Sequence, residues 1–126
     1  MDALHAMQTA AALFAIAALG GLTMAVIRLR GADRPPSSFA MLHGLLAGAG
    51  LTLLIYAWWT VGLPPFAQYS VIVLALAAAG GAFMNLRFHS QMLPLPIPLM
   101  FGHALLAVTG FALLLIALMK PATGGP

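Results

Sequence analysis

Four long apolar runs constrain this 126-residue sequence more than any other feature. A helix needs about 20 residues to cross a hydrocarbon core of about 30 Å, and each run reaches that length. Glycines, prolines and arginines separate the runs, which predicts short connections. We expect one domain over residues 1–126, an all-α four-helix transmembrane bundle with helices at about Leu4–Ile27, Ser38–Val61, Phe66–Leu86 and Pro98–Met119.

The overall composition supports a membrane location. Hydrophobic residues make up 63% of the chain, charged residues only 6%, and the mean hydropathy is +1.05. Such a chain is too apolar for a soluble domain of this length, so its first partner is the lipid bilayer. The net charge of +3 comes from a few residues between the apolar runs, and it does not indicate nucleic-acid binding.

The arginines predict the orientation in the membrane. Arg28, Arg30 and Arg34 lie between the first two runs and Arg87 lies between the last two, whereas the middle connection has no charge. Basic residues favour the cytoplasmic side. We therefore expect a multi-pass protein of the bacterial inner (cytoplasmic) membrane, with both termini in the periplasm.

The chain also contains an internal repeat. A shift of 60 residues aligns the segment AALGGLTM, residues 17–24, with AAAGGAFM, residues 77–84, without a gap. The same shift aligns HGLLA, residues 43–47, with HALLA, residues 103–107. We expect a tandem 2+2 helix repeat, residues 4–61 and 66–119. Two crossings per repeat give both repeats the same orientation, so a pseudo-twofold axis along the membrane normal should relate them.

Two histidines occupy equivalent positions in this repeat. His43 and His103 begin matching stripes of retained residues at helical spacing on the second and fourth helices. A stripe that is retained while its flanks differ is expected to face the shared interior, so the two imidazoles should lie at one depth across the axis. A neutral imidazole that bonds a carbonyl or a threonine is the structural alternative, but paired polar groups inside a membrane favour a function.

Haem ligation is the sharper hypothesis for the histidine pair. Imidazole is a usual axial ligand of haem iron, and facing helices of a bundle build cofactor sites. Counting about 1.5 Å per residue places both histidines about 8–10 Å from the cytoplasmic boundary, near two glycine pairs. These glycines either admit a porphyrin edge or allow ordinary close helix packing. The candidate cofactor contacts are therefore His43 and His103 as metal ligands, with Gly20, Gly21, Gly80 and Gly81 beside them.

Polar residues near the cytoplasmic boundary suit the haem propionates. Arg28 and Arg87 lie close to that level, and guanidinium groups pair well with carboxylates, although arginines here also serve orientation and bind lipid phosphate. His89 sits at the membrane surface and has Leu29 as its repeat equivalent. It is either an interfacial residue, a propionate partner, a ligand of a second haem or part of a quinone or donor site.

Missing residue types narrow the possible chemistry. The chain has no cysteine, which excludes covalent haem attachment and Fe–S clusters, so any haem would be b-type. No Asp or Glu lies inside an apolar run, and a proton-coupled antiporter normally needs one there. No hydrolase, Walker or Rossmann motif is present. Electron transfer is thus better supported than an enzyme with its own substrate chemistry.

Three segments carry a family resemblance: LHGLLAGAG, LRFH and GHALLAVTGF. They resemble a group of short four-helix bacterial inner-membrane proteins over nearly the whole chain, which implies the fold but no activity. The histidine placement is more loosely similar to bacterial four-helix membrane b-type cytochromes, in which histidines on facing helices ligate haem. That resemblance carries over to His43 and His103, with His89 as a third candidate. A histidine pair at each membrane face is lacking here, so one haem or none is expected.

Taken together, these patterns predict a membrane b-type cytochrome. It would bind haem b through His43 and His103 and exchange electrons with quinone or a partner subunit. The alternative is a non-catalytic accessory subunit of a larger membrane complex, whose histidines only pack or bind a pigment. Small-molecule transport is a third hypothesis, and a homo-oligomer is compatible with each of them.

Overall fold

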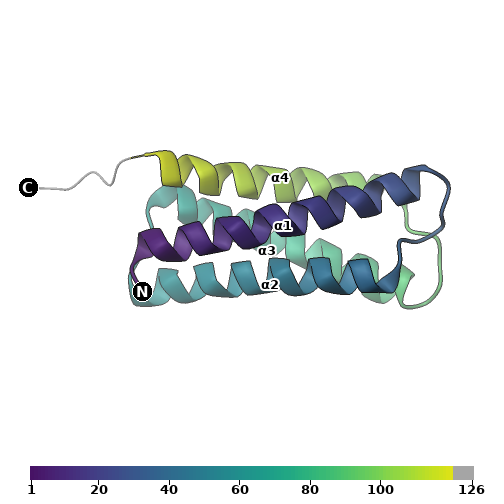
Figure 1. Cartoon of the computed structure of the whole chain (residues 1–126), viewed down its shortest axis with the longest axis horizontal. Coiled ribbons are helices and arrows are strands. Elements are labelled where there is room, and N and C mark those ends of the chain that lie inside the picture. Colours follow the sequence, from purple (N-terminus) through teal and green to yellow (C-terminus); the bar gives the residue numbers. More distant parts are fainter. Residues whose placement is uncertain (121–126) are drawn as a thin grey trace, which may run out of the picture.

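The computed structural model describes residues 1–120 and has the expected all-α architecture. Four long helices run along the length of the molecule, and each is antiparallel to the two helices on which it packs (Figure 1). A single π-helical turn, η1, extends the third helix. The bounds are α1 Ala3–Leu29, α2 Ser37–Thr60, α3 Pro65–Met84, η1 Asn85–His89 and α4 Ile97–Met119.

Local sequence explains where the helices start. The Asp2 carboxylate accepts a hydrogen bond from the His5 backbone N–H at 2.9 Å and caps α1. Prolines occupy the first turns of α3 and α4, where a missing N–H costs nothing.

Glycines in the left-handed region stop the first two helices. Gly31, with φ of +105°, ends α1, and its N–H donates to Arg28 O while the next N–H donates to Ile27 O. This pair of bonds is a Schellman motif, which satisfies carbonyls that the helix leaves free. Gly62, with φ of +77°, turns the chain between α2 and α3.

The third helix differs from the expectation. The sequence predicts a regular helix to about Leu86, whereas the α-helical geometry ends at Met84 and continues as the π turn. The Ser90 N–H there donates to Asn85 O, five residues back, at 2.8 Å. The π turn thus contains one residue more than an α-helical turn, and the chain leaves the helix after it.

The helices form two hairpins that lie side by side. α1 packs most extensively on α2, and α3 on α4, while α1 with α4 and α2 with α3 make smaller contacts. The connections within the hairpins lie at one end of the bundle, and the α2–α3 turn lies at the other end with the N-terminus (Figure 1). Hence α2 and α4 face each other across the bundle rather than as neighbours.

All four helices are long and apolar enough to cross a membrane. Their most apolar windows have mean hydropathies of 2.2, 1.8, 1.8 and 2.2 in chain order, with the π turn counted as part of the third span. This supports the expected multi-pass membrane protein. The charged residues of the described chain lie outside or at the ends of these windows, as a bilayer requires.

Packing divides the bundle into two halves. We call the end with the N-terminus, made by helical residues 3–17, 50–60, 65–77 and 110–119, the terminal half; residues 18–29, 37–49, 78–89 and 97–109 make the histidine half. In the histidine half the buried helical residues are Met84 and Met100 alone. The terminal half holds the core: Ala6, Met7, Ala10, Phe14, Ala17, Gly50, Leu54, Ala57, Ala67, Ser70, Val71, Leu74, Ala77, Gly110, Leu114 and Ala117.

Candidate histidine site

The structure brings His43 of α2 and His103 of α4 together inside the bundle. Their ring centroids are 6.1 Å apart and the ring planes are inclined by 75°. Both side chains are half-buried. The expectation that the two imidazoles meet across the interior is therefore met by the geometry of the pair.

Each imidazole is held by a backbone carbonyl of the other helix in its own hairpin. His43 Nδ1 lies 2.8 Å from Ala17 O on α1, and His103 Nδ1 lies 2.8 Å from Ala77 O on α3. A carbonyl oxygen only accepts, so Nδ1 carries the hydrogen in both rings. This assignment leaves Nε2 of each ring with its lone pair free to accept a hydrogen bond or bind a metal.

The Nε2 atoms have no partner among the described residues. The hydrogen bonds of both side chains involve Nδ1 alone, and neither Nε2 atom is completely enclosed by the protein. A lone pair that faces a membrane interior without a partner is costly. Each Nε2 atom keeps some exposed surface and is therefore reachable by an occupant that could interact with its lone pair.

Glycines give the rings their space. A Cβ placed on Gly21 would lie 3.1 Å from His43 Cε1, and one on Gly81 would lie 3.0 Å from His103 Cε1. These two glycines thus contact the imidazoles themselves. Gly20 and Gly80 are different, because a Cβ would meet only His43 Cβ at 3.8 Å on Gly20 and nothing within 4 Å on Gly80.

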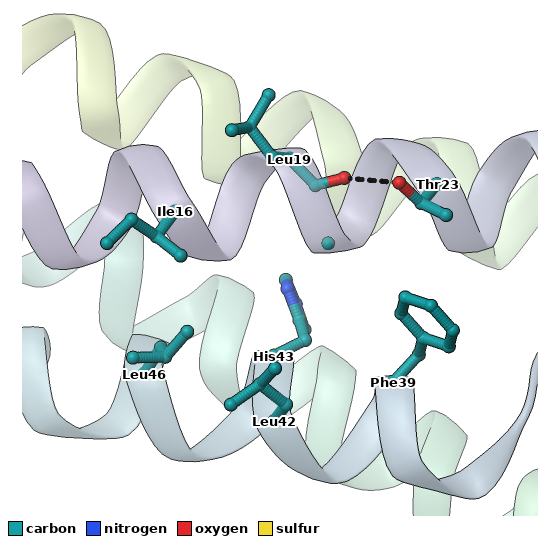
Figure 2. Close-up of a pocket in the computed structure, with 8 residues that line it drawn as sticks. Ile16, Leu19, Thr23, Phe39, Leu42, His43 and Leu46 are labelled. Carbon is teal, nitrogen blue, oxygen red and sulfur yellow. Dashed lines mark hydrogen bonds between the residues drawn. The ribbon is translucent and has the colours of Figure 1, made fainter.

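A groove on the first hairpin also reaches His43. Figure 2 shows the imidazole rising from α2 toward α1, with aliphatic side chains of both helices around it. The groove has a volume of about 260 Å³ and opens outward, since Leu19 and Leu42 on its walls are 66% and 57% exposed. Its lining is Ile16, Leu19, Gly20, Thr23, Phe39, Leu42, His43 and Leu46.

The remaining candidate residues lie at the loop end. Arg28 is half-buried; its Nε donates to Leu95 O at 2.8 Å and its Nη1 to Ala32 O at 3.1 Å. Arg87 is exposed and lies 5.5 Å over the Phe88 ring. His89 Nε2 is 3.2 Å from Ser37 Oγ at the start of α2. None of these three residues contacts the histidine pair by a hydrogen bond in the described chain.

No side chain in the sequence marks the two carbonyls that hold the histidines. Ala17 and Ala77 act through their backbone, so no residue type marks them. They stand 26 residues before their histidines in both hairpins, a spacing that means something only once the hairpin geometry is known. The contact of Ser37 with His89 also depends on how the hairpins pack, so the sequence did not predict it.

Comparison with protein-family models, with curated proteins and with solved structures finds no match for this chain. The function of the protein is therefore inferred from the site itself.

The donor set indicates which kind of metal group suits the site. The described residues contain no group of three or more His, Cys, Asp or Glu side chains that could hold a metal ion. A protein-bound zinc ion takes three or four protein ligands, so two imidazoles alone do not make such a site. Haem iron needs only axial ligands from the protein, because the porphyrin supplies the other four.

Distances and packing agree with that group. Two metal–nitrogen bonds of about 2 Å, added to the radii of two imidazole rings, would separate the ring centroids by roughly 6 Å if both Nε2 atoms pointed at one metal; the centroids lie 6.1 Å apart. A ligating histidine usually donates its second N–H to a carbonyl, and both rings do so. The helical side chains of the histidine half are less buried than those of the terminal half. The residues present thus fit haem.

Proposed function

We propose that this protein is a membrane b-type cytochrome in which His43 and His103 ligate one haem b. The observation that carries the proposal is the histidine pair itself. Its rings are 6.1 Å apart, and each uses Nδ1 for a carbonyl and keeps Nε2 unbonded within the described chain. A bound haem supplies a one-electron couple, which would serve exchange with quinone or a partner subunit.

The chain's residues have defined parts in this proposal. The carbonyls of Ala17 and Ala77 fix the tautomer and orientation of the imidazoles and raise the basicity of Nε2. Gly21 and Gly81 allow the rings to lie against α1 and α3. The surrounding side chains are apolar, which lowers the local dielectric and limits access of water. Arg28 and Arg87 lie toward the loop end, where propionates would need cationic partners.

The tandem repeat and its pseudo-twofold axis belong to the same proposal. Two hydrogen bonds recur at a shift of 60 residues, His43 with Ala17 and His103 with Ala77. Residues 41–60 and 101–120 are buried, half-buried or exposed in the same order at every position. These matches support two equivalent hairpins that each contribute one axial ligand.

The proposed location is the bacterial inner membrane with both termini in the periplasm. The support is the distribution of arginines: Arg28, Arg30, Arg34 and Arg87 lie at the loop end, and the α2–α3 turn has no charge. Reporter fusions after Gly31 and after Gly62 test it. Opposite compartments, with Gly31 inside, are expected, and an external Gly31 would overturn the orientation.

Absorption spectroscopy tests the haem. Protein purified from cells with ample haem is expected to show a Soret band and sharp α and β bands on reduction. His43→Ala and His103→Ala should each abolish the six-coordinate low-spin spectrum, and the double variant should lose little more. His5→Ala is the matched control, since His5 is exposed and pairs with Asp2 at 2.9 Å. A colourless wild type that takes up no hemin would overturn the proposal.

One observation favours the accessory-subunit alternative. Imidazoles inclined by 75° at 6.1 Å also make a T-shaped aromatic contact, a favourable packing arrangement without any cofactor. In that case His43→Phe and His103→Phe should leave folding and assembly intact. Under the cytochrome proposal the same variants also fold, but they lose a low-spin haem spectrum that the wild type shows. An accessory subunit without haem shows no such spectrum in either form, so comparing wild type and variants separates the two functions.

A further inference from the structure

The π turn at the end of α3 changes which residues of the two hairpins correspond. Before it, residues 72–83 match residues 12–23 in burial at every position, at a shift of 60. From Arg87, inside the turn, onward, residues 87–91 match residues 26–30 at a shift of 61 instead. A π hydrogen bond spans five residues where an α-helical bond spans four, so the turn takes up the one extra residue.

With this shift, His89 becomes the counterpart of Arg28. The sequence pairs His89 with Leu29, an exposed residue, whereas Arg28 and His89 are both half-buried. Arg87, by contrast, takes the place of the exposed Val26. The turn therefore puts the basic side chain of His89, rather than that of Arg87, where the first hairpin has its guanidinium group.

Arg28 and His89 each form a hydrogen bond with the opposite hairpin, close to the start of that hairpin's second helix. Arg28 Nε, at the end of α1, donates to Leu95 O just before α4. His89 Nε2, at the end of α3, bonds Ser37 Oγ at the start of α2. Two further bonds join the loops, from Arg34 Nη1 to Met92 O at 2.6 Å and from Leu95 N to Asp33 O at 3.0 Å.

These bonds lie next to the loosely packed part of the bundle. The histidine half buries only Met84 and Met100 among its helical residues, so side-chain packing does little there to fix the distance between hairpins. His43 and His103 belong to different hairpins, and their separation depends on that distance. Polar bonds at the loop end are the nearest fixed links between the hairpins on this side.

We propose that Arg28 and His89 are equivalent positioning residues, one from each hairpin, that fasten the loop ends together and so set the distance between His43 and His103. The π turn is the device that brings His89 into register for this role. What the inference says about a haem site rests on the proposed function. What it says about hairpin separation rests on the hydrogen bonds between the hairpins alone.

The first experiment measures hairpin separation without any cofactor. The chain has no cysteine, so nitroxide labels can be attached to cysteines that replace Phe39 and Leu99, two equivalent exposed positions of α2 and α4. His89→Ala and Ser37→Ala should each broaden the distance distribution, and the double variant should broaden it no further. His89→Gln, which retains an N–H donor, should restore most of the narrow distribution. Unchanged distributions in both alanine variants would overturn the proposal.

A matched pair of deletions tests the role of the π turn. Deleting Leu86 should convert the turn to regular α-helix and leave His89 facing Ser37, so the label distribution should stay narrow. Deleting Val26, which the 60-residue shift pairs with Leu86, should rotate Arg28 by about 100° away from Leu95 and broaden the label distribution. Equal broadening by the two deletions would contradict the one-residue register shift.

The second measurement tests whether the two positioning residues, Arg28 and His89, which we call the fasteners, affect haem ligation. If the wild type binds haem, His89→Ala should raise the high-spin fraction and His89→Gln should bring it down again, whereas His5→Ala, at an exposed residue paired with Asp2, should leave the spectrum unchanged. A protein that binds no haem but shows the expected label distances would refute the proposed function and leave the fasteners supported. Normal haem binding with an unaffected spectrum in His89→Ala would show that the fasteners do not position the histidines.

Discussion

The two halves of this bundle differ in packing and in glycine content, since the helices of the histidine half hold seven glycines and those of the terminal half hold two. In the terminal half, Leu54 and Leu114 are completely buried, and Gly50 and Gly110 let Phe14 and Leu74 fill the centre. In the histidine half the same four helices leave their inner faces half-buried. We infer that the terminal half stabilises the bundle through close packing, whereas the histidine half keeps space beside the two imidazoles.

The largest expected difference concerns leucines. Leu54→Ala and Leu114→Ala each remove a completely buried side chain and should lower the free energy of unfolding by about 2–5 kcal/mol. Leu46→Ala and Leu106→Ala, at equivalent half-buried positions of the histidine half, should cost much less. Reversible unfolding in detergent measures all four. Equal losses in the two halves would show that the histidine half is packed as tightly as the terminal half.

Glycines sharpen the same comparison with a smaller effect. A Cβ on Gly110 would lie 2.6 Å from Leu74 Cγ, so Gly110→Ala should destabilise the bundle by about 1–3 kcal/mol through overpacking. Gly102→Ala and Gly44→Ala meet nothing within 4 Å and should be neutral or slightly stabilising. The difference is checked by thermal unfolding. A destabilised Gly102→Ala would reveal contacts that the described helices lack.

At the site itself, a methyl group should affect ligation more than stability. Gly81→Ala places its Cβ 3.0 Å from His103 Cε1 and must move the ring, so haem affinity and the low-spin fraction should fall while the unfolding free energy changes by less than about 1 kcal/mol. Gly80→Ala is the matched control, with nothing within 4 Å. If both variants bind haem like the wild type, the position of the imidazole is not set by Gly81.

The smallest effect is expected at the first turn of the terminal half. The backbone N–H of His5, followed by its side chain, lowers the pKa of Asp2 below the ordinary value of 3.8. The capping contribution is thus present above that value and is lost as the pH falls through the lowered pKa. Asp2→Ala should lower the amide-exchange protection factors in the first turn of α1 at neutral pH, and acid should lower these protection factors in the wild type only. Unchanged exchange in Asp2→Ala would show that the cap does not hold the turn.

Sequence alone determined the architecture, for a simple physical reason. Each helix must satisfy its own backbone in a membrane, so length and hydropathy define it locally. The expected bounds differ from the structure by one or two residues for most ends. His43 and His103 were found from their equivalent places in a repeat, and the structure places them together.

Tertiary structure decided what local patterns do not encode. The carbonyls of Ala17 and Ala77 come near the imidazoles only through hairpin packing, and Gly21 and Gly81 proved to face the rings. The π turn of η1 depends on hydrogen-bond register, which residue types at Asn85–His89 do not specify, so the partnership of His89 with Ser37 was beyond sequence reasoning. The higher glycine content of the histidine half is visible in the sequence, but which side chains pack closely depends on which of them meet across the bundle.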